Sequence, residues 1–480
     1  MGGFPIRDNF IAEILNPQKM YVQQLYTNCL AQAAYYLESD REALIVDPLR
    51  DPTPYIELAQ SRGAIIKYIL ESHFHADFVS GHLDLANATH AEIVFGPDAK
   101  PSYPAHIAKD GERLKLGKIE IEVLHTPGHT IESSCFLVYN DANIPQILFS
   151  GDTLFAGDVG RPDLLSGNLD AETLAGMLYD SLQKKIKTLP DEVIVYPGHG
   201  AGSACGKNIG KETVTTIGKQ KKGNYALQNM PKEIFVKLVT EGQTAPPQYF
   251  FSDAKLNKMG YEKFEEVLKH NLHFVASPEF DRMRHEGAVV LDTRAPEVFA
   301  LGHVPGSVNI GIDGDFAVWT GTLYPFTTDF LLVTENDRAK ESVTRLARIG
   351  YDRVTGILEG GIESWIKSGR PVDHIPLISP VEFEKLAESG KYVVLDVRRP
   401  AETEQKRLRF AKSLPLSEFV SRLNQLDRNE KYIVCCAGGY RSMIASSIMK
   451  AAGIEEVLNV SGGVARILEE KPELVEEVVL

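Results

Sequence analysis

Cysteine, excess positive charge and long apolar runs are all scarce in this chain of 480 residues. A net charge of −14 without a long basic stretch argues against a nucleic-acid partner. The longest apolar stretches have the length of a β-strand, well below the ~18 residues of a membrane-spanning helix. The cysteines are too few and too scattered for a disulfide framework: Cys29, Cys135, Cys205, Cys435 and Cys436.

The N-terminus and the thiols suggest a location. The first fifteen residues, MGGFPIRDNFIAEIL, lack the basic region and apolar core of a secretory signal. Because the thiols are not committed to disulfides, we expect a cytoplasmic enzyme whose cysteines are available for chemistry. A length of 480 residues suggests about three domains, if one domain occupies roughly 150 residues.

The chain changes character after its first half. Residues 20–200 alternate strand-like apolar runs with polar or helical stretches, which predicts an α/β domain. Farther on, VVLDTRAPE (289–297) returns as VVLDVRRPAE (393–402), an offset of 104 residues, which indicates two tandem copies of one α/β unit. We therefore predict a first domain over 1–245, a linker or docking segment with paired prolines over 246–272, and two copies over 273–374 and 375–480.

Four short motifs in the first domain carry histidine and aspartate. Each follows an apolar run, so we expect each at the C-terminal end of a strand, where loops build sites. Histidine nitrogens and carboxylate oxygens are donors that borderline divalent metals accept. One such motif would fit surface histidines, but four in series predict a metal site. The motifs are ESHFHADFVSGH with His73, His75 and Asp77, TPGHT with His129, FSGDTLF with Asp152, and YPGHG with His199.

The order and approximate spacing of these motifs resemble the HxHxDH signature and later ligands of the metallo-β-lactamase superfamily, over about residues 20–240. Membership would imply an αβ/βα sandwich with the metal in a cleft at one edge. Phe78 departs from the signature, which carries a second histidine there in members with two metals. Phenylalanine cannot ligate, so the second site would keep only Asp77, His199 and the shared Asp152. We therefore predict a mononuclear site.

Within the superfamily the chain resembles the persulfide dioxygenase branch, which includes the ETHE-type sulfur dioxygenases. The resemblance implies one Fe(II) per chain, held by His73, His129 and Asp152, with three coordination positions left for substrate sulfur and O₂. Asp77 and His199 would orient ligands or accept protons. His75 stays open as a fourth ligand, in which case zinc and hydrolysis would be favoured.

The same resemblance suggests substrate-binding residues. GDVGRPDL supplies Arg161 and Asp163, which match a Gly-Arg-x-Asp motif whose arginine lies near a carboxylate-bearing thiol substrate. A surface salt bridge is the alternative for this pair. Cys205, just beyond His199, matches a cysteine of bacterial dioxygenases fused to rhodaneses, where it would take up sulfur; the alternative is a small packed residue. His82 is interpreted as a packing or surface histidine.

A second candidate site lies near the C-terminus, in KYIVCCAGGYRSMIASSIMKAAG (431–453). A strand-like run leads into a glycine-bearing loop and a helix, so backbone N–H groups and Arg441 would favour a thiolate and hold an anion. Counted from Cys436, the loop is C-x-x-G-x-R and resembles the rhodanese loop, with Gly438 and Gly439. Counted from Cys435, it has the C-x₅-R spacing of tyrosine phosphatases. The duplicated VVLDxR element favours a rhodanese with Cys436 as nucleophile.

The two copies differ. The first keeps HVPGSVNI, close to a rhodanese stretch, but no cysteine lies anywhere between 205 and 435. Without a thiol it cannot carry sulfane sulfur, so we interpret it as a structural or docking pseudo-rhodanese. In the second copy RLRFAKSLPL replaces the corresponding stretch, so its flanks are expected to differ while the loop survives.

These resemblances predict two linked reactions. The first domain would oxidise a low-molecular-weight persulfide with O₂ to sulfite and thiol, and Cys436 would pass sulfane sulfur to sulfite, giving thiosulfate. The carrier thiol would be glutathione, coenzyme A, bacillithiol or a similar thiol, and a homodimer or homotetramer is usual for the family. The alternatives are a zinc thioesterase of the glyoxalase II type and a sulfur-relay protein with an inactive metal domain.

Overall fold

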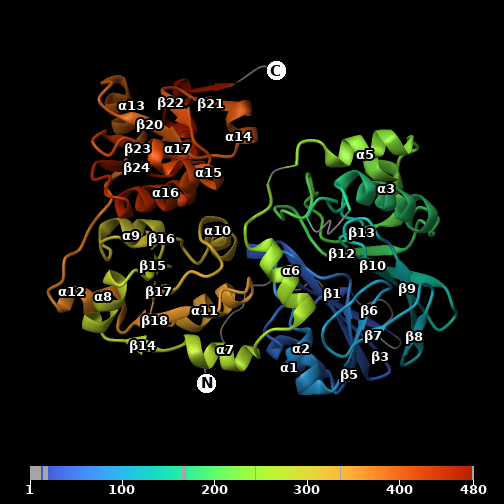
Figure 1. The fold of residues 1–480 in the computed structure, drawn as a ribbon. Helices are drawn as coiled ribbons and strands as arrows, with labels where there is room; N and C mark the ends of the chain where they lie inside the picture. Colours follow the sequence, from blue (N-terminus) through green and yellow to red (C-terminus); the bar gives the residue numbers. More distant parts are fainter. Residues whose placement is uncertain (1–11, 14–19, 165–168, 244, 336, 478–480) are drawn as a thin grey trace. The chain divides into compact units, whose positions relative to one another are not determined.

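The computed structural model describes residues 12–13, 20–164, 169–243, 245–335 and 337–477. Of residues 1–15, for which we expected no secretory signal, all but 12 and 13 lie outside this described part. The chain divides into two compact units, residues 1–266 with 347–350 and residues 267–346 with 351–480 (Figure 1). Among the described helices, none combines the length and the apolar character needed to cross a bilayer.

The first unit is built on two sheets (Figure 1). The seven-stranded sheet runs in chain order through β1 (Ala12–Glu13), β2 (Tyr21–Thr27), β3 (Gln32–Ser39), β4 (Glu42–Val46), β5 (Ile65–Glu71), β6 (Glu92–Phe95) and β7 (His106–Ile107). The six-stranded sheet runs in reverse chain order through β13 (Thr215–Thr216), β12 (Ile194–Pro197), β11 (Pro145–Gly151), β10 (Ser134–Tyr139), β9 (Ile119–His125) and β8 (Arg113–Leu116).

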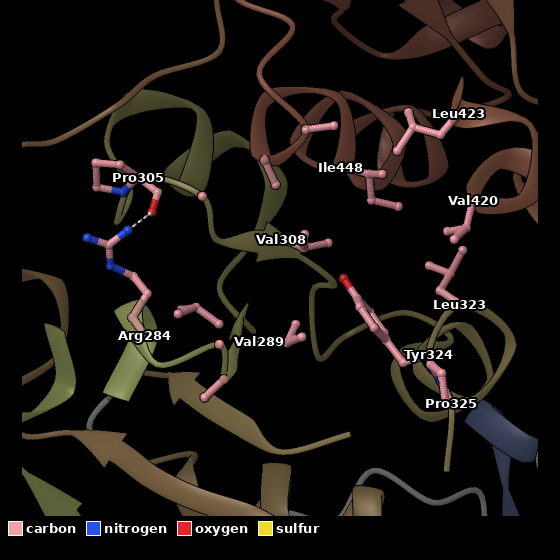
Figure 2. Close-up of a pocket in the computed structure, with 16 residues that line it drawn as sticks. Arg284, Val289, Pro305, Val308, Leu323, Tyr324, Pro325, Val420, Leu423 and Ile448 are labelled. Carbon is pink, nitrogen blue, oxygen red and sulfur yellow. Dashed lines mark hydrogen bonds between the residues drawn. The ribbon is translucent and has the colours of Figure 1, made fainter. Parts of the chain in front are cut away.

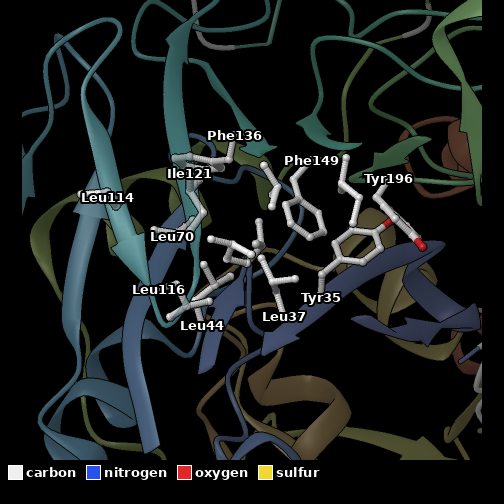
Figure 3. Close-up of a cluster of buried hydrophobic side chains, with 14 of the residues drawn as sticks. Tyr35, Leu37, Leu44, Leu70, Leu114, Leu116, Ile121, Phe136, Phe149 and Tyr196 are labelled. Atoms are coloured by element: carbon white, nitrogen blue, oxygen red, sulfur yellow. The ribbon is translucent and has the colours of Figure 1, made fainter. Parts of the chain in front are cut away.

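Alternating side chains explain how these sheets pack. On β3, Tyr35 and Leu37 enter the apolar core shared with β8–β12, where Tyr35 meets Phe149 at 5.1 Å between ring centroids (Figure 3). Their neighbours Ala34 and Tyr36 point to the opposite face and pack in another cluster. Because successive strand residues face opposite sides, one apolar strand serves two layers.

Helices cover the outer face of each sheet. On the first sheet lie α1 (Thr53–Arg62) and α2 (His82–Thr89), and on the second lie α3 (Ala171–Ser181), a π-helical turn η2 (Leu182–Ile186), α4 (Ile217–Gly223) and α5 (Lys232–Thr240). The short 3₁₀ turns of this unit are η1 (Asn28–Leu30) and η3 (Tyr225–Leu227). The layers are helix, sheet, sheet and helix, so the predicted αβ/βα sandwich is confirmed.

The first unit continues past residue 245, into the stretch expected to be a linker or docking segment. This stretch contains α6 (Phe250–Met259) and α7 (Phe264–Asn271), and the first unit includes α6 and the start of α7. The buried Asn257 of α6 hydrogen-bonds the loop after β5: its Nδ2 donates to the carbonyls of His75 and Phe78, both at 2.7 Å, and its Oδ1 accepts from the N–H of Ser80 at 2.8 Å. The segment is therefore a docked support of that loop.

The second unit repeats one parallel sheet, as the duplicated sequence predicts. The first sheet has the order β14 (Phe274–Val275), β18 (Val354–Leu358), β17 (Phe330–Val333), β15 (Val289–Asp292) and β16 (Val308–Asn309). The second has the matching order β19 (Leu377–Ile378), β24 (Val457–Val460), β23 (Tyr432–Cys435), β20 (Val393–Asp396) and β22 (Ala411–Ser413).

The helices occur in the same order along the two copies. The first copy has α8 (Ser277–His285), α9 (Pro296–Leu301), α10 (Phe316–Leu323), α11 (Ala339–Ala347) and α12 (Gly361–Lys367). The second has α13 (Pro380–Glu388), α14 (Pro400–Gln405), α15 (Leu416–Arg422), α16 (Tyr440–Ala451) and α17 (Gly463–Glu470), with 3₁₀ turns η4 (Leu423–Gln425) and η5 (Pro472–Leu474). The divergent RLRFAKSLPL stretch still supplies β22, and it adds β21 (Lys406–Leu408), which pairs with β25 (Val475–Glu477).

The repeated VVLDxR motif forms a buried ion pair in each copy. The Arg294 guanidinium donates to both carboxylate oxygens of Asp292, and Arg398 does the same to Asp396. All four residues are at most 5% exposed. The arginine Nη2 also reaches a carbonyl eight residues along, Gly302 O at 2.9 Å in the first copy and Lys406 O at 2.8 Å in the second. The motif therefore has a structural role in both copies.

We expect Arg294→Ala to destabilise the first copy by about 3–5 kcal/mol, because it leaves the Asp292 carboxylate buried without its partner. Both tryptophans of the chain, Trp319 and Trp365, lie in this copy, so urea unfolding followed by tryptophan fluorescence reports on it. Arg282→Ala, which removes a surface ion pair on α8, is the control and should shift the free energy of unfolding by no more than about 0.5 kcal/mol. Equal shifts for the two variants would contradict the structural role.

Candidate metal centre and cysteine loop

Loops that follow strand ends bring the four motifs of the first unit together. His73 and Asp77 follow β5, His129 follows β9, Asp152 follows β11, and His199 follows β12. Glycines allow the close approach: a Cβ on Gly198 would lie 2.6 Å from Asp152 Oδ1, and Gly151 has φ of 47° with a Cβ position 2.6 Å from a serine side chain.

The carboxylate of Asp152 lies among three histidines. Its Oδ2 is 3.4 Å from His129 Nε2 and 4.0 Å from His73 Nε2, and its Oδ1 is 3.6 Å from His199 Nε2. All four side chains are buried. Donor atoms 3–4 Å apart are what ligands at ~2.1 Å from a common ion would show. The residues predicted as metal ligands therefore converge.

Backbone carbonyls orient two of these rings. Arg161 O lies 2.8 Å from His129 Nδ1, and Ala31 O lies 3.1 Å from His199 Nδ1. Because a carbonyl only accepts hydrogen bonds, each ring carries a proton on Nδ1, so the neutral ring turns the lone pair of Nε2 toward Asp152. This is the tautomer that a metal ligand needs.

Several buried polar atoms of the centre make no hydrogen bond within the described residues: both carboxylate oxygens of Asp152, Oδ1 of Asp77, and Nε2 of His73 and His199. Burying a carboxylate without a partner is costly, so such atoms normally face a donor, a water or a cation. Neutral imidazoles that carry their proton on Nδ1 offer these oxygens no donor. The residues present fit a metal ion.

His75 does not join this group. Its Nε2 lies 3.1 Å from Asp47 Oδ1 and 3.7 Å from Glu71 Oε2, and its ring stacks on Phe78 at 4.2 Å between centroids. Burial lowers the pKa of His75, but the carboxylates of Asp47 and Glu71 outweigh it and raise the pKa to about 9. A protonated ring has no lone pair for a metal. The ring of Phe78 thus supports the ring of His75.

A second donor set adjoins the first. Asp77 Oδ2 lies 3.3 Å from His199 Nε2, and the Cys205 sulfur lies within 4.8 Å of both side chains' donor atoms. Cys205 thus adds a third donor to Asp77 and His199. Burial and the carboxylates of Asp77 and Asp152 raise the pKa of the Cys205 thiol well above its usual range. The described residues fit one metal ion or two, and their geometry alone does not select the element.

The predicted substrate arginine is held by its own motif. Arg161 is buried, and its Nε and Nη2 donate to the two oxygens of Asp163 at 2.7 and 2.6 Å. Its backbone N–H donates to Cys205 O at 2.9 Å. The backbone of Arg161 therefore connects the His129 loop to the Cys205 loop. His82 is fully buried among aromatic rings, including Tyr103, as a packing histidine would be.

Sequence reasoning missed the residues that support the centre. Asp47 and Glu71 end strand-like runs, where an acidic residue carries no distinctive signal, and Asn257 lies 182 residues from His75. The run ESHFHAD does hint at Glu71, because it stands two residues before His73. Nothing in the local sequence identifies Asn257.

The C-terminal loop has the arrangement that its sequence predicts. Cys435 ends β23 and is fully buried, and burial raises the pKa of its thiol well above the usual range. Cys436 starts the loop, and its Sγ accepts the N–H of Gly439 at 3.1 Å. Gly439 has φ of 103° and precedes α16, whose N-terminus faces the loop. The sulfur of Cys436 is therefore placed where backbone N–H groups stabilise a thiolate.

The loop arginine is already paired. Arg441 Nη1 and Nη2 donate to the two carboxylate oxygens of Glu402 at 2.6 and 2.8 Å. Glu402 belongs to the RRPAE part of the repeat and was not singled out from the sequence. Gly438, the other predicted loop glycine, is exposed and lines the cavity at Cys436.

A separate cavity of about 510 Å³ lies between the two copies of the second unit (Figure 2). Val289, Val308 and Leu323 line it from the first copy, and Val420 and Ile448 from the second. Its lining, all within the described part of the chain, contains no cysteine, histidine or carboxylate. The cavity therefore offers a ligand an apolar surface but no thiol, imidazole or carboxylate for chemistry.

An αβ/βα sandwich with buried histidine and aspartate donors at its strand ends defines a metal-binding protein. The sequence matches the metallo-beta-lactamase superfamily over residues 27–199 and the rhodanese-like domain over residues 277–368 and 379–470. A metallo-beta-lactamase structure from Staphylococcus aureus is 32% identical with a TM-score of 0.64, and the match covers 71% of this chain and 99% of that one. The chain belongs to the metallo-beta-lactamase superfamily, with two rhodanese-like domains after the metal domain.

Two other relatives match a smaller share. A probable hydroxyacylglutathione hydrolase of Schizosaccharomyces pombe is 34% identical over 172 residues, which are 35% of this chain and 62% of that protein. This chain thus spans about three fifths of the length of that curated relative. The structure of ETHE1 from Myxococcus xanthus is 25% identical with a TM-score of 0.43, covering 49% of this chain and 97% of that one.

We expect Asp152→Asn to lower metal affinity at least about tenfold, because it removes the charged donor that faces three histidines. Metal content by mass spectrometry after dialysis against a weak chelator measures the loss. His90→Asn, which changes an exposed histidine in a left-handed conformation that asparagine tolerates, is the control. Retention of full metal content by Asp152→Asn would show that the ion binds elsewhere.

Proposed function

We propose that the chain oxidises a low-molecular-weight persulfide at one iron and transfers sulfane sulfur through Cys436. The overall first reaction is RSSH + O₂ + H₂O → RSH + SO₃²⁻ + 2 H⁺. The second passes a sulfur atom from another persulfide to sulfite and yields thiosulfate. Both reactions use a persulfide, and the second consumes the sulfite that the first produces. Placing the two sites in one chain therefore keeps sulfite near the site that uses it.

The orientation of His75 carries the proposal. With His75 held by Asp47 and Glu71, the remaining set of His73, His129 and Asp152 is two histidines and one carboxylate. Such a set on one face of Fe(II) leaves open positions for a sulfur ligand and O₂. A set of His73, His75 and His129, which would favour zinc, requires His75 to leave its carboxylate partners.

The residues of the chain have separate tasks in this reaction. His73, His129 and Asp152 would hold the iron, which supplies one-electron chemistry with O₂. Asp77 and His199, 3.3 Å apart, are placed to receive the protons that the reaction releases. Cys205 lies beside them, at a position where it would contact the substrate sulfur.

The atoms and electrons of the sulfur transfer at Cys436 balance without a further oxidant. The thiolate of Cys436 attacks the terminal sulfur of RSSH, the S–S bond of the donor breaks, and RS⁻ leaves. Sulfite then attacks the outer sulfur of the Cys436 persulfide, giving thiosulfate and the free thiolate. The N–H of Gly439 and the N-terminus of α16 stabilise the negative sulfur in both steps.

A thioesterase is the second candidate. The similarity to hydroxyacylglutathione hydrolases and the additional donor set of Asp77, His199 and Cys205 favour it, because two neighbouring metals suit hydrolysis. The cysteine loop of the second copy has no task in such a reaction.

We expect anaerobically purified protein to contain about one iron per chain and to consume O₂ when glutathione persulfide is added. His129→Ala should lose the uptake, because it removes a ligand. Cys436→Ser should keep the uptake and release sulfite in place of thiosulfate, since only the transfer step is removed. An oxygen electrode and chromatographic quantification of sulfite and thiosulfate measure both effects.

The same preparation also tests the thioesterase. Two zinc ions per chain, no O₂ uptake and hydrolysis of a hydroxyacylglutathione thioester would overturn the dioxygenase proposal. Oxygen uptake that is unchanged in His129→Ala would contradict the assigned ligands but not the reaction.

A further inference from the structure

The cavity at Cys436 is lined by both copies of the second unit. Its volume is about 390 Å³, and its lining includes Cys436, Gly438 and Arg441 from the catalytic copy. The cysteine-free copy contributes Asp315 and Trp319, both from the start of α10. A copy without a thiol therefore forms part of the reactive site.

A specific contact holds α10 in this place. The Tyr440 hydroxyl, at the first residue of α16, donates to Gly311 O at 2.7 Å. Its ring lies against Gly314, where a Cβ would come within 2.4 Å of the ring. A second hydrogen bond between the copies joins the Asn309 N–H to Ser447 Oγ at 3.0 Å. The loop before α10 is thus docked on the helix that follows the catalytic cysteine.

The charged groups that line this cavity largely oppose one another. Both carboxylate oxygens of Glu402 already engage the fork of Arg441, so that cation is neutralised. Arg399 is the other arginine of the lining, and Asp315 opposes it within electrostatic range. With the thiolate of Cys436 included, the lining carries three negative and two positive charges. An ammonium group on a ligand would offset this excess of negative charge.

The Asp315 side chain is available to a ligand. It stands at the N-cap position of α10 but makes no capping hydrogen bond. Beside it, the largely buried indole of Trp319 and the ring of Tyr440 supply a flat apolar wall. An acidic group next to an aromatic wall recognises an organic molecule that carries an ammonium group.

We propose that Asp315 and Trp319 of the cysteine-free copy are specificity-determining residues for the sulfur donor of Cys436, and that this donor is a persulfide whose carrier thiol bears a primary ammonium group. The inference rests on the proposed sulfur transfer and narrows its substrate. The ammonium group pairs with Asp315, and the carrier packs on Trp319. Glutathione and bacillithiol have such a group, whereas coenzyme A has phosphates instead.

The test compares glutathione persulfide with its N-acetyl derivative, in which an uncharged acetamide replaces the ammonium group. Both are mixed anaerobically with the full-length protein, and the gain of one sulfur atom on Cys436 is followed by rapid quench and mass spectrometry. Cys436→Ser identifies any sulfur taken up elsewhere, including at Cys205. We expect wild-type protein to load from the ammonium-bearing donor roughly fivefold faster, as for one partly exposed ion pair.

Two variants separate the contribution of the Asp315 carboxylate from that of the aromatic wall. Asp315→Asn should remove the preference and bring the ratio of the two rates close to one, while Trp319→Ala should slow both donors. Asp313→Asn is the matched control: it makes the same change two residues away, at an exposed side chain paired with Arg338 outside the cavity, and should keep the preference.

The outcomes distinguish this inference from the function on which it rests. Equal loading from both donors by wild-type protein, or a preference that survives Asp315→Asn, would overturn the inference and leave the transfer intact. No loading of Cys436 from either donor would overturn the proposed transfer itself, and the inference with it.

Discussion

The buried carboxylate of Asp152 is the constraint on which the metal domain depends. Its two oxygens face the Nε2 atoms of three histidines and accept no hydrogen bond among the described residues. An unpaired carboxylate in such surroundings would oppose folding, so a cation has to offset its charge. The strand ends, the tight glycine at 198 and the carbonyls behind the imidazoles all serve to present donors to this one position.

Two histidines separated by a single residue have opposite environments. His73 turns its Nε2 toward Asp152, whereas His75 forms an ionic contact with Asp47 and Glu71. The buried ring of Phe78 lies against His75 and closes its side of the loop. Carboxylates around the donor atoms, more than the histidines themselves, determine how many imidazoles are left for a metal.

The sequence allowed the fold and much of the site to be predicted. Motifs such as TPGHT end strands, and strand ends converge, so the approach of His129 to Asp152 follows from local pattern plus sheet geometry. The tandem copies follow from the repeat of VVLDxR. What local sequence does not contain is the partner from far along the chain. Asn257 supports the metal loop from a segment expected to be a linker or docking segment, and Trp319 lines the cavity at Cys436 from the copy that lacks a thiol.

Phe78 shows the limit of reasoning from one missing ligand. From the sequence its presence predicts a lost donor, but the sequence does not show that Cys205 comes within reach of Asp77 and His199. Only the folded loops place that thiol beside the second donor set.

The contacts of Tyr440 with Gly311 and Gly314 bear on whether the second copy is a self-contained unit. A rhodanese-like domain is commonly regarded as a portable unit, because its cysteine loop is continuous in sequence. Here one wall of the reactive cavity belongs to the other copy, so residues 375–480 do not contain a complete site. The two copies therefore form one body around this cavity, and a transplant or truncation has to keep both copies together.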